Sequence, residues 1–142
     1  MSMTLTAVRL AKIAELVLSD KGLTVNQFRM LTFIEAGAPP LPELSKRLVM
    51  KGPNLTVLID GLVSRGLAQR DRDPADARRK KLSLTQSGTR LRAEAEAACE
   101  AAFDYLLDKA SRPRVPRSGL LAWEHILDDV AIEELRLRLA SA

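Results

Sequence analysis

Cysteine and histidine are almost absent from this sequence, and their scarcity excludes several kinds of chemistry. Cys99 is the only cysteine among 142 residues, and His125 is the only histidine. One cysteine rules out an internal disulfide and a metal site built from several thiolates. Cys99 lies among alanines, so we expect a buried, unreactive thiol rather than a redox sensor. We expect His125 to be a structural or surface residue.

Aromatic residues and long apolar runs are also scarce. Aromatic side chains make up 4% of the sequence and hydrophobic residues 46%, so the core must consist mainly of Leu, Ala, Val and Ile, which favours helices. No apolar run approaches the ~20 residues that a membrane-spanning helix needs, and the N-terminus lacks the pattern of a signal peptide. We expect residues 1–142 to form a single domain of a cytoplasmic protein with no membrane partner.

The residue patterns of common enzymes are missing as well. We find no nucleophile beside a base, no glycine-rich phosphate loop and no metal-ligand spacing. Asp71, Asp73 and Asp76 form an acidic cluster, but the interleaved Arg70, Arg72 and Arg78 favour ion pairs within that segment over a calcium or magnesium site. The sequence thus predicts a protein that is not an enzyme, with no catalytic residue, no cofactor and no metal ion.

Positive charge is concentrated in the middle third of the chain. Residues 41–85 contain ten Lys or Arg and five Asp or Glu, a net charge of +5, although the whole chain carries only +4. The remaining residues therefore carry −1. A basic segment within an otherwise nearly neutral chain indicates a polyanionic partner that is bound by one lobe.

Two helices are predicted before the basic segment. Apolar residues at helical spacing predict the first over residues 4–20, and Lys21-Gly22 is a typical end for it. Thr24 and Gln27 have the spacing of a capping box, which predicts a second helix that runs to about Ala36.

A third and a fourth helix follow across a short turn. Pro42 suits the first turn of a short third helix that ends near Val49. The fourth helix is predicted over residues 53–65, and the two together are typical of a helix-turn-helix. Leucines are expected to line one side of the third helix: Leu41, Leu44 and Leu48.

The fourth helix has an apolar back and a short, mixed front. Pro53 suits its first turn, and Gly66 suits the left-handed position beyond its end, with Leu67 as the apolar partner. A helix with such a front can lie in a DNA major groove; an ordinary amphipathic surface helix is the alternative. The back is formed by Leu55, Leu58, Ile59, Leu62 and Val63, and the front by Lys51, Asn54, Thr56, Val57, Asp60 and Ser64.

A β-hairpin is predicted after the fourth helix. Residues 68–72 and 82–84 are candidate strands, and the intervening Asp73-Pro74-Ala75-Asp76 is typical of a turn. The basic run at residues 78–81 precedes the second strand. We expect Asp76 and Arg78 to stabilise this hairpin, or wing, by pairing with each other.

Two further helices complete the chain. Thr85 is predicted to cap a long helix that reaches about Ala110, and two prolines between residues 111 and 117 separate it from a last helix that begins at Ser118. The last helix is apolar on most sides, which indicates an oligomer interface. The inward residues of the long helix are predicted to be Leu91, Ala95, Ala98, Ala102, Tyr105 and Leu106.

Four segments together resemble the MarR-type winged helix-turn-helix transcriptional regulators. In chain order they are Leu23-Thr24-x-x-Gln27; Leu44-Ser45-x-x-Leu48 through Asp60-x-Leu62-x-x-x-Gly66-Leu67; Asp73-Pro74-x-Asp76-x-Arg78; and Leu82-x-Leu84-Thr85-x-x-Gly88. The wing and its exit are the most specific of these. The sequence departs from the family at Val57 and Gly61, where basic residues are common, and at Ala77, where the family often has arginine.

The resemblance implies a mainly α fold with a small β-hairpin wing (α+β), a DNA-binding lobe over about residues 24–88, and dimerisation helices over about 4–20 and 89–142. It implies a homodimer, usually a repressor, that binds a near-palindromic operator in double-stranded DNA and is released by a small aromatic or anionic effector. A winged-helix protein–protein interaction module is the alternative.

The site residues follow from this combined interpretation, in three groups. The fourth helix, here called the reading helix, is expected to contact bases and phosphates through Lys51, Pro53, Asn54, Thr56 and Val57. The wing is expected to contact phosphates or the minor groove through Arg78, Arg79 and Lys80, braced by Asp76. The dimer interface is expected to include Leu5, Val8, Leu120, Leu121, Ile126, Leu127 and Val130.

Overall fold

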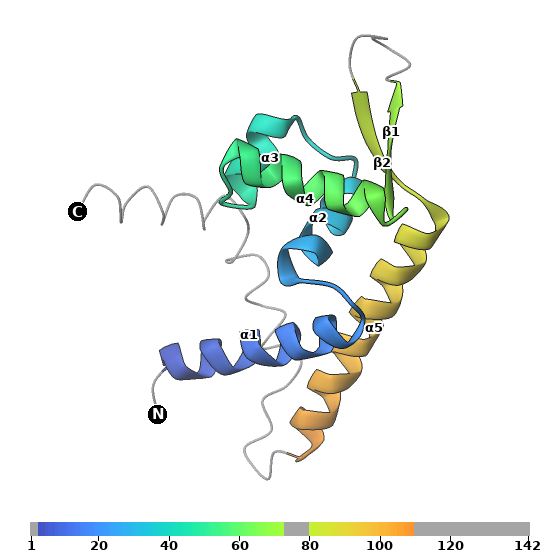
Figure 1. Cartoon of the computed structure of the whole chain (residues 1–142). Coiled ribbons are helices and arrows are strands. Elements are labelled where there is room, and N and C mark those ends of the chain that lie inside the picture. Colours follow the sequence, from blue (N-terminus) through green and yellow to red (C-terminus); the bar gives the residue numbers. More distant parts are fainter. Residues whose placement is uncertain (1–2, 73–79, 110–142) are drawn as a thin grey trace, which may run out of the picture.

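The winged helix-turn-helix predicted from the sequence is present in the computed structural model, which describes residues 3–72 and 80–109. Figure 1 shows α3, α4 and the hairpin at one end, α1 at the other, and α5 running between them along one side. The elements are α1 (Met3–Asp20), α2 (Val25–Glu35), α3 (Leu41–Arg47), α4 (Gly52–Ser64), β1 (Ala68–Arg72), β2 (Lys80–Leu84) and α5 (Gln86–Lys109).

The ends of α1 and α2 are set by local hydrogen bonds that the sequence predicts. Gly22 has φ +70°, and the N–H of Leu23 returns to the carbonyl of Leu18 at 2.9 Å. Thr24 and Gln27 complete both halves of the capping box, at 3.1 and 2.9 Å. The predicted turn between the first two helices is therefore confirmed.

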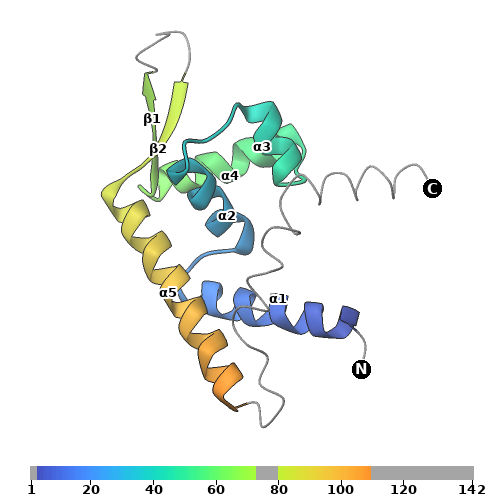
Figure 2. The same ribbon diagram turned by 180° about the vertical axis from the view of Figure 1, so that it is seen from behind.

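The core lies where α2 meets its neighbours. This helix contacts α1, α4, β2 and α5, and Figure 2 shows it between α4 and α5 from behind. The predicted apolar back of α4 is confirmed, because Leu55, Ile59 and Leu62 are buried and Leu58 and Val63 are partly buried. Within the described residues, the other buried apolar side chains are Leu18, Leu23, Met30, Leu31, Ile34, Leu44, Leu48, Leu67, Ala68 and Ala95.

The turn between α3 and α4 contains the one described non-glycine residue with positive φ. Val49 has φ 53°, and its N–H bonds to the carbonyl of Lys46 at 3.0 Å. Met50 donates to the carbonyl of Ser45 at 2.9 Å, and the Ser45 hydroxyl returns a bond to the carbonyl of Met50. These paired bonds end α3 in a Schellman-type cap at a position that normally holds glycine.

The hairpin and the start of α5 meet at a tight junction. β1 and β2 are antiparallel, with Ala68 opposite Leu84 and Arg70 opposite Leu82. Thr85 caps α5 as predicted, accepting from the N–H of Gly88 at 3.0 Å. A Cβ built on Gly88 would lie 1.9 Å from the carbonyl oxygen of Leu67. Only glycine allows the two backbones to come this close.

Two residues that are predicted to face inward on α5 are exposed instead. Tyr105 is 61% exposed and Leu106 42%, so the prediction that they face the interior is wrong for this chain. Leu41, which is predicted to line one side of the third helix with Leu44 and Leu48, is 53% exposed, whereas those two leucines are buried. Leu41 precedes the turn of α3 that packs on the core. Tyr105 and Leu106 lie near the end of α5, beyond the part that packs on α2.

Some predictions lie outside the described residues. They are the wing turn over residues 73–76, the basic residues Arg78 and Arg79, and the last helix from Ser118 onward with His125. Among the described helices, none combines the length and hydropathy that crossing a membrane requires.

We predict that replacing Val49 with glycine stabilises the fold. A β-branched residue in the left-handed region is strained, and the Val49 side chain is 44% exposed, so its removal loses little burial. Val49→Gly should raise the free energy of unfolding by about 1 kcal/mol, measured by urea denaturation. A loss of stability would show that Val49 makes compensating contacts.

We predict opposite effects of alanine at two glycines. Gly88→Ala should lower the free energy of unfolding by about 3 kcal/mol, because the new methyl overlaps the Leu67 carbonyl. Gly61 lies inside α4, and beyond its chain neighbours and the helix backbone no atom lies within 4 Å of the position that a methyl would take there, so Gly61→Ala should raise the free energy of unfolding by about 1 kcal/mol. Equal effects at both glycines in thermal denaturation would contradict the close approach at Gly88.

Candidate nucleic-acid interface

The outer face of α4 is a continuous exposed surface of short side chains. Asn54, Thr56, Val57 and Asp60 are all exposed, and Val57 is 71% exposed. The buried leucines on the opposite side fix the helix, so this face is presented without being part of the core. The structure thus brings the predicted reading-helix residues onto one surface.

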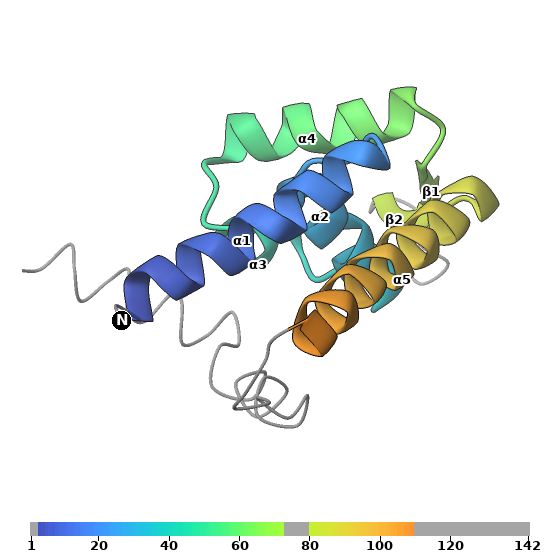
Figure 3. The same ribbon diagram turned by 90° about the horizontal axis from the view of Figure 1, so that it is seen from below.

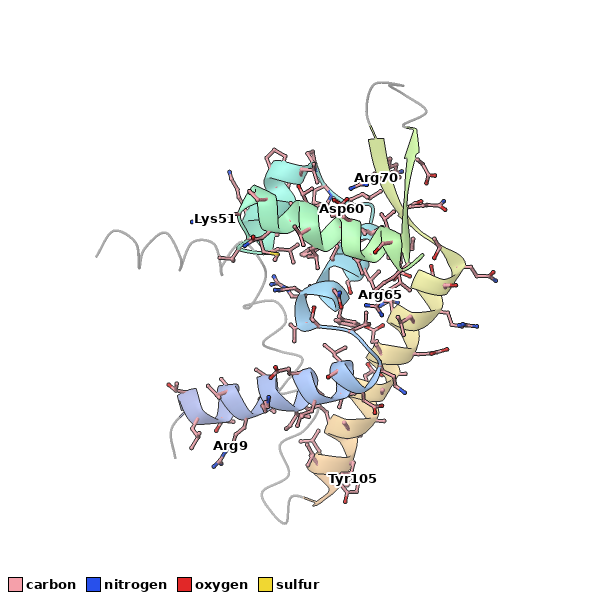
Figure 4. The ribbon with its side chains drawn as sticks, in the orientation of Figure 1. Arg9, Lys51, Asp60, Arg65, Arg70 and Tyr105 are labelled. Atoms are coloured by element: carbon pink, nitrogen blue, oxygen red, sulfur yellow. The ribbon has the colours of Figure 1, made fainter. Side chains whose placement is uncertain are left out.

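Lys51 lies at the N-terminus of this helix, where it extends away from the body of the protein (Figure 4). It occupies the N-cap position, makes no side-chain capping bond, and no acidic residue lies in the first turn. A cation beside the positive end of a helix dipole is unfavourable in the free protein. An anion such as a phosphate would satisfy both the ammonium and the free N–H groups of the first turn.

Asp60 and Arg70 connect the reading helix to the hairpin. The Arg70 guanidinium donates to the Asp60 carboxylate, and Figure 4 shows both between α4 and the strands. The prediction that Arg70 pairs within the wing is therefore wrong, since its partner lies on α4. No sequence pattern indicates this pair, because ten residues and a change of element separate its members.

The described part of the hairpin has further polar contacts along β1. The hydroxyl of Ser83 donates to the carboxylate of Asp71, and the amide of Gln69 lies 3.4 Å from the same carboxylate. Lys81 is exposed on β2. Lys80 begins β2, two residues before the predicted strand, so the basic run enters the sheet. Arg78, Arg79 and the Asp76 brace lie outside the described residues.

The residues of α1 that are predicted to form the dimer interface lie far from the outer face of α4. Leu5 and Val8 are 46% and 60% exposed. Figure 3, seen from below, shows α1 and the far half of α5 in front, at the opposite end from α3, α4 and the hairpin of Figure 1. Leu120, Leu121, Ile126, Leu127 and Val130 lie outside the described residues.

Cys99 and the acidic residues give no chemical site in the described part of the chain. Cys99 is half-buried rather than fully buried. Desolvation by burial, and to a lesser extent the charge of Glu96, raises the pKa of its thiol, which keeps it protonated and weakly nucleophilic. Within residues 3–72 and 80–109, no group of His, Cys, Asp and Glu side chains could hold a metal ion.

Comparison with known proteins agrees with this geometry. Residues 21–79 match the model of the MarR family. No curated protein matches the chain.

Three solved structures illustrate the likeness of fold. The apo form of MarR from E. coli is 23% identical with a TM-score of 0.71, over 88% of this chain and 93% of that one. CouR from Rhodococcus jostii RHA1 bound to p-coumaroyl-CoA is 23% identical with a TM-score of 0.71, over 91% and 88%. The transcriptional repressor CouR bound to a 23-mer DNA duplex is 26% identical with a TM-score of 0.69, over 88% of each chain.

We predict that Lys51→Ser stabilises the protein and weakens its binding to DNA. Serine at the N-cap would accept a bond from the first turn, which should add about 1 kcal/mol to the free energy of unfolding. Loss of one phosphate contact should reduce the salt dependence of DNA affinity by about one unit of slope. Lys12→Ser on α1 is the matched control and should leave the slope unchanged. A stabilised Lys51→Ser protein with unchanged slope would place Lys51 away from the phosphates.

Proposed function

Because residues 21–79 match the model of the MarR family and the described chain has a winged helix-turn-helix fold, we propose that this protein is a DNA-binding transcriptional regulator. The observation that carries the proposal is the outer face of α4. It is exposed, it consists of short polar and apolar side chains, and it is held rigidly by the buried Leu55, Ile59 and Leu62. In the proposed complex α4 lies in the major groove.

The contacts divide into two kinds. Lys51 is proposed to bind a phosphate at the N-terminus of α4, while Pro53, Asn54, Thr56 and Val57 approach the bases. Arg78, Arg79 and Lys80 are proposed to bind phosphates or the adjoining minor groove from the hairpin, braced by Asp76. What supports this arrangement is the Asp60–Arg70 pair, because it fixes the base of the hairpin beside the reading helix.

A homodimer is proposed from the opposite end of the molecule. Leu5, Val8 and Leu16 of α1 and Leu106 of α5 are exposed, and their surface, here called the α1–α5 apolar surface, lies away from α4. A second copy would cover it by symmetric contact. The apolar residues of the last predicted helix are proposed to join this interface: Leu120, Leu121, Ile126, Leu127 and Val130.

Repression and control by a ligand complete the proposal. CouR is described as a transcriptional repressor on a DNA duplex and is also known with p-coumaroyl-CoA bound. By analogy, we propose a repressor that acts in the cytoplasm and releases its operator when a small aromatic or anionic effector binds.

We expect selection from a random-sequence duplex library to enrich a near-palindrome. A symmetric dimer places two reading helices one DNA turn apart, ~34–36 Å, so the half-site centres should lie about 10 base pairs apart. Sedimentation at micromolar protein should show a dimer, and gel retardation should weaken steeply with salt.

Two results would contradict different parts of this proposal. Failure to retard any duplex at low salt would favour the protein–protein interaction module. A monomer in sedimentation that still selects a tight palindrome would overturn the proposed dimer but leave the DNA-binding function intact.

A further inference from the structure

The reading helix carries no positively charged side chain. The sequence of α4, GPNLTVLIDGLVS, contains neither Lys nor Arg, and Asp60 is its only charged residue. The most common specific contact to guanine is a bidentate bond from Arg or Lys to its O6 and N7 atoms. Within its own length, α4 has no group that could make this contact.

Nearby arginines are engaged with other groups. Arg70 donates to Asp60, Arg65 lies 3.3 Å from the side-chain oxygen of Gln27 on α2, and the Nε of Arg47 donates to Glu43 at 3.1 Å. Each bond directs a guanidinium to a protein partner. Lys51 lies at the end of the helix, where it faces the phosphates in the proposed complex.

Methyl groups occupy the centre of the outer face instead. Val57 is the most exposed of the large hydrophobic residues that the structure describes, at 71%. The hydroxyl of its neighbour Thr56 donates its proton to the carbonyl of Gly52 at 3.2 Å. Thr56 can then offer a base only acceptor lone pairs and its methyl group. The surface between Asn54 and Asp60 is therefore apolar at its middle.

We infer that α4 recognises the 5-methyl groups of thymines, so that the base pairs under its centre are A·T rather than G·C. The inference rests on the proposed function and deepens it by naming the chemical feature that is read. A thymine methyl projects only into the major groove and suits contact with Val57 and the Thr56 methyl. Asn54, one turn nearer the N-terminus, has the amide that pairs with adenine N6 and N7.

The experiment removes the methyl groups from the DNA. The duplexes selected from the random library are resynthesised with deoxyuridine in place of thymine, one symmetric pair of positions at a time. This replacement deletes a methyl from the major groove and leaves the minor-groove face unchanged. For at least one pair of positions we expect a loss of about fourfold in affinity per methyl removed, the effect of withdrawing one buried methyl-sized group.

Protein variants show whether the effect passes through α4. Val57→Ala combined with Thr56→Ser should bind the thymine and uracil duplexes with nearly equal affinity, because the Val57 γ-methyls and the Thr56 methyl that meet the base are gone while the Thr56 hydroxyl is kept. Both side chains are exposed, so the two substitutions should leave the fold intact. Val25→Ala, at an exposed valine on α2, is the matched control and should keep the full difference between the two duplexes.

Different results would contradict the thymine inference and the proposed regulator function. Guanines at the positions under α4, or uracil duplexes bound as tightly as thymine duplexes at every position, would overturn the inference while the regulator function stood. A thymine–uracil difference that persists in the variant with both Val57→Ala and Thr56→Ser would also overturn it, by assigning the methyl contact to another element. If the library yields no enriched sequence, the proposed function fails and the inference with it.

Discussion

The close contact between Leu67 and Gly88 is the constraint on which the arrangement of the lobe depends. The N–H of Thr85 donates to the Leu67 carbonyl at 3.1 Å, and the Thr85 hydroxyl donates to the Gly66 carbonyl at 2.6 Å. The same hydroxyl accepts from Gly88 at 3.0 Å. One threonine thus joins the end of α4, the base of the hairpin and the start of α5. A side chain on residue 88 would separate them.

Much of the fold could be predicted because its signals are local. The capping box at Thr24, the glycine at residue 66 and the spacing of Leu55, Ile59 and Leu62 each act within a few residues, so the sequence alone indicates the helix that results. The exposed front of α4 could be predicted for the same reason, since a buried back implies an exposed opposite face.

Contacts between distant elements were not predictable in this way. Nothing in the pattern around Arg70 indicates that its partner is Asp60 rather than a neighbour in the hairpin, because the choice depends on how α4 packs beside β1. Tyr105 and Leu106 continue the apolar period of α5, yet α2 packs against an earlier part of that helix and leaves them exposed. Periodicity identifies one face of a helix but not the length over which a partner covers it.

The places where the sequence opposes the local rules lie together beside the candidate interface. Val49 adopts a conformation suited to glycine, and Lys51 occupies a cap position suited to serine or aspartate. Both residues adjoin the N-terminus of α4. A chain optimised only for stability would carry neither, and such local inconsistency is typical of a surface selected for binding.

The long helix α5 connects the two ends of the molecule. At its start, Thr85 and Gly88 join α5 to the end of α4 and the base of the hairpin. Further along α5, the Arg92 side chain is 15% exposed and lies 2.6 Å from Glu35 of α2 and 2.8 Å from Glu96. Because a buried cation is costly to leave without its carboxylate, α2 and α5 resist separation at this pair. The helix α5 therefore links the α1–α5 apolar surface to α2 directly, and to the end of α4 through the bonds of Thr85. In the proposed dimer, the angle between the two copies of α5 would set the distance between the reading helices, and so the half-site spacing that the protein accepts.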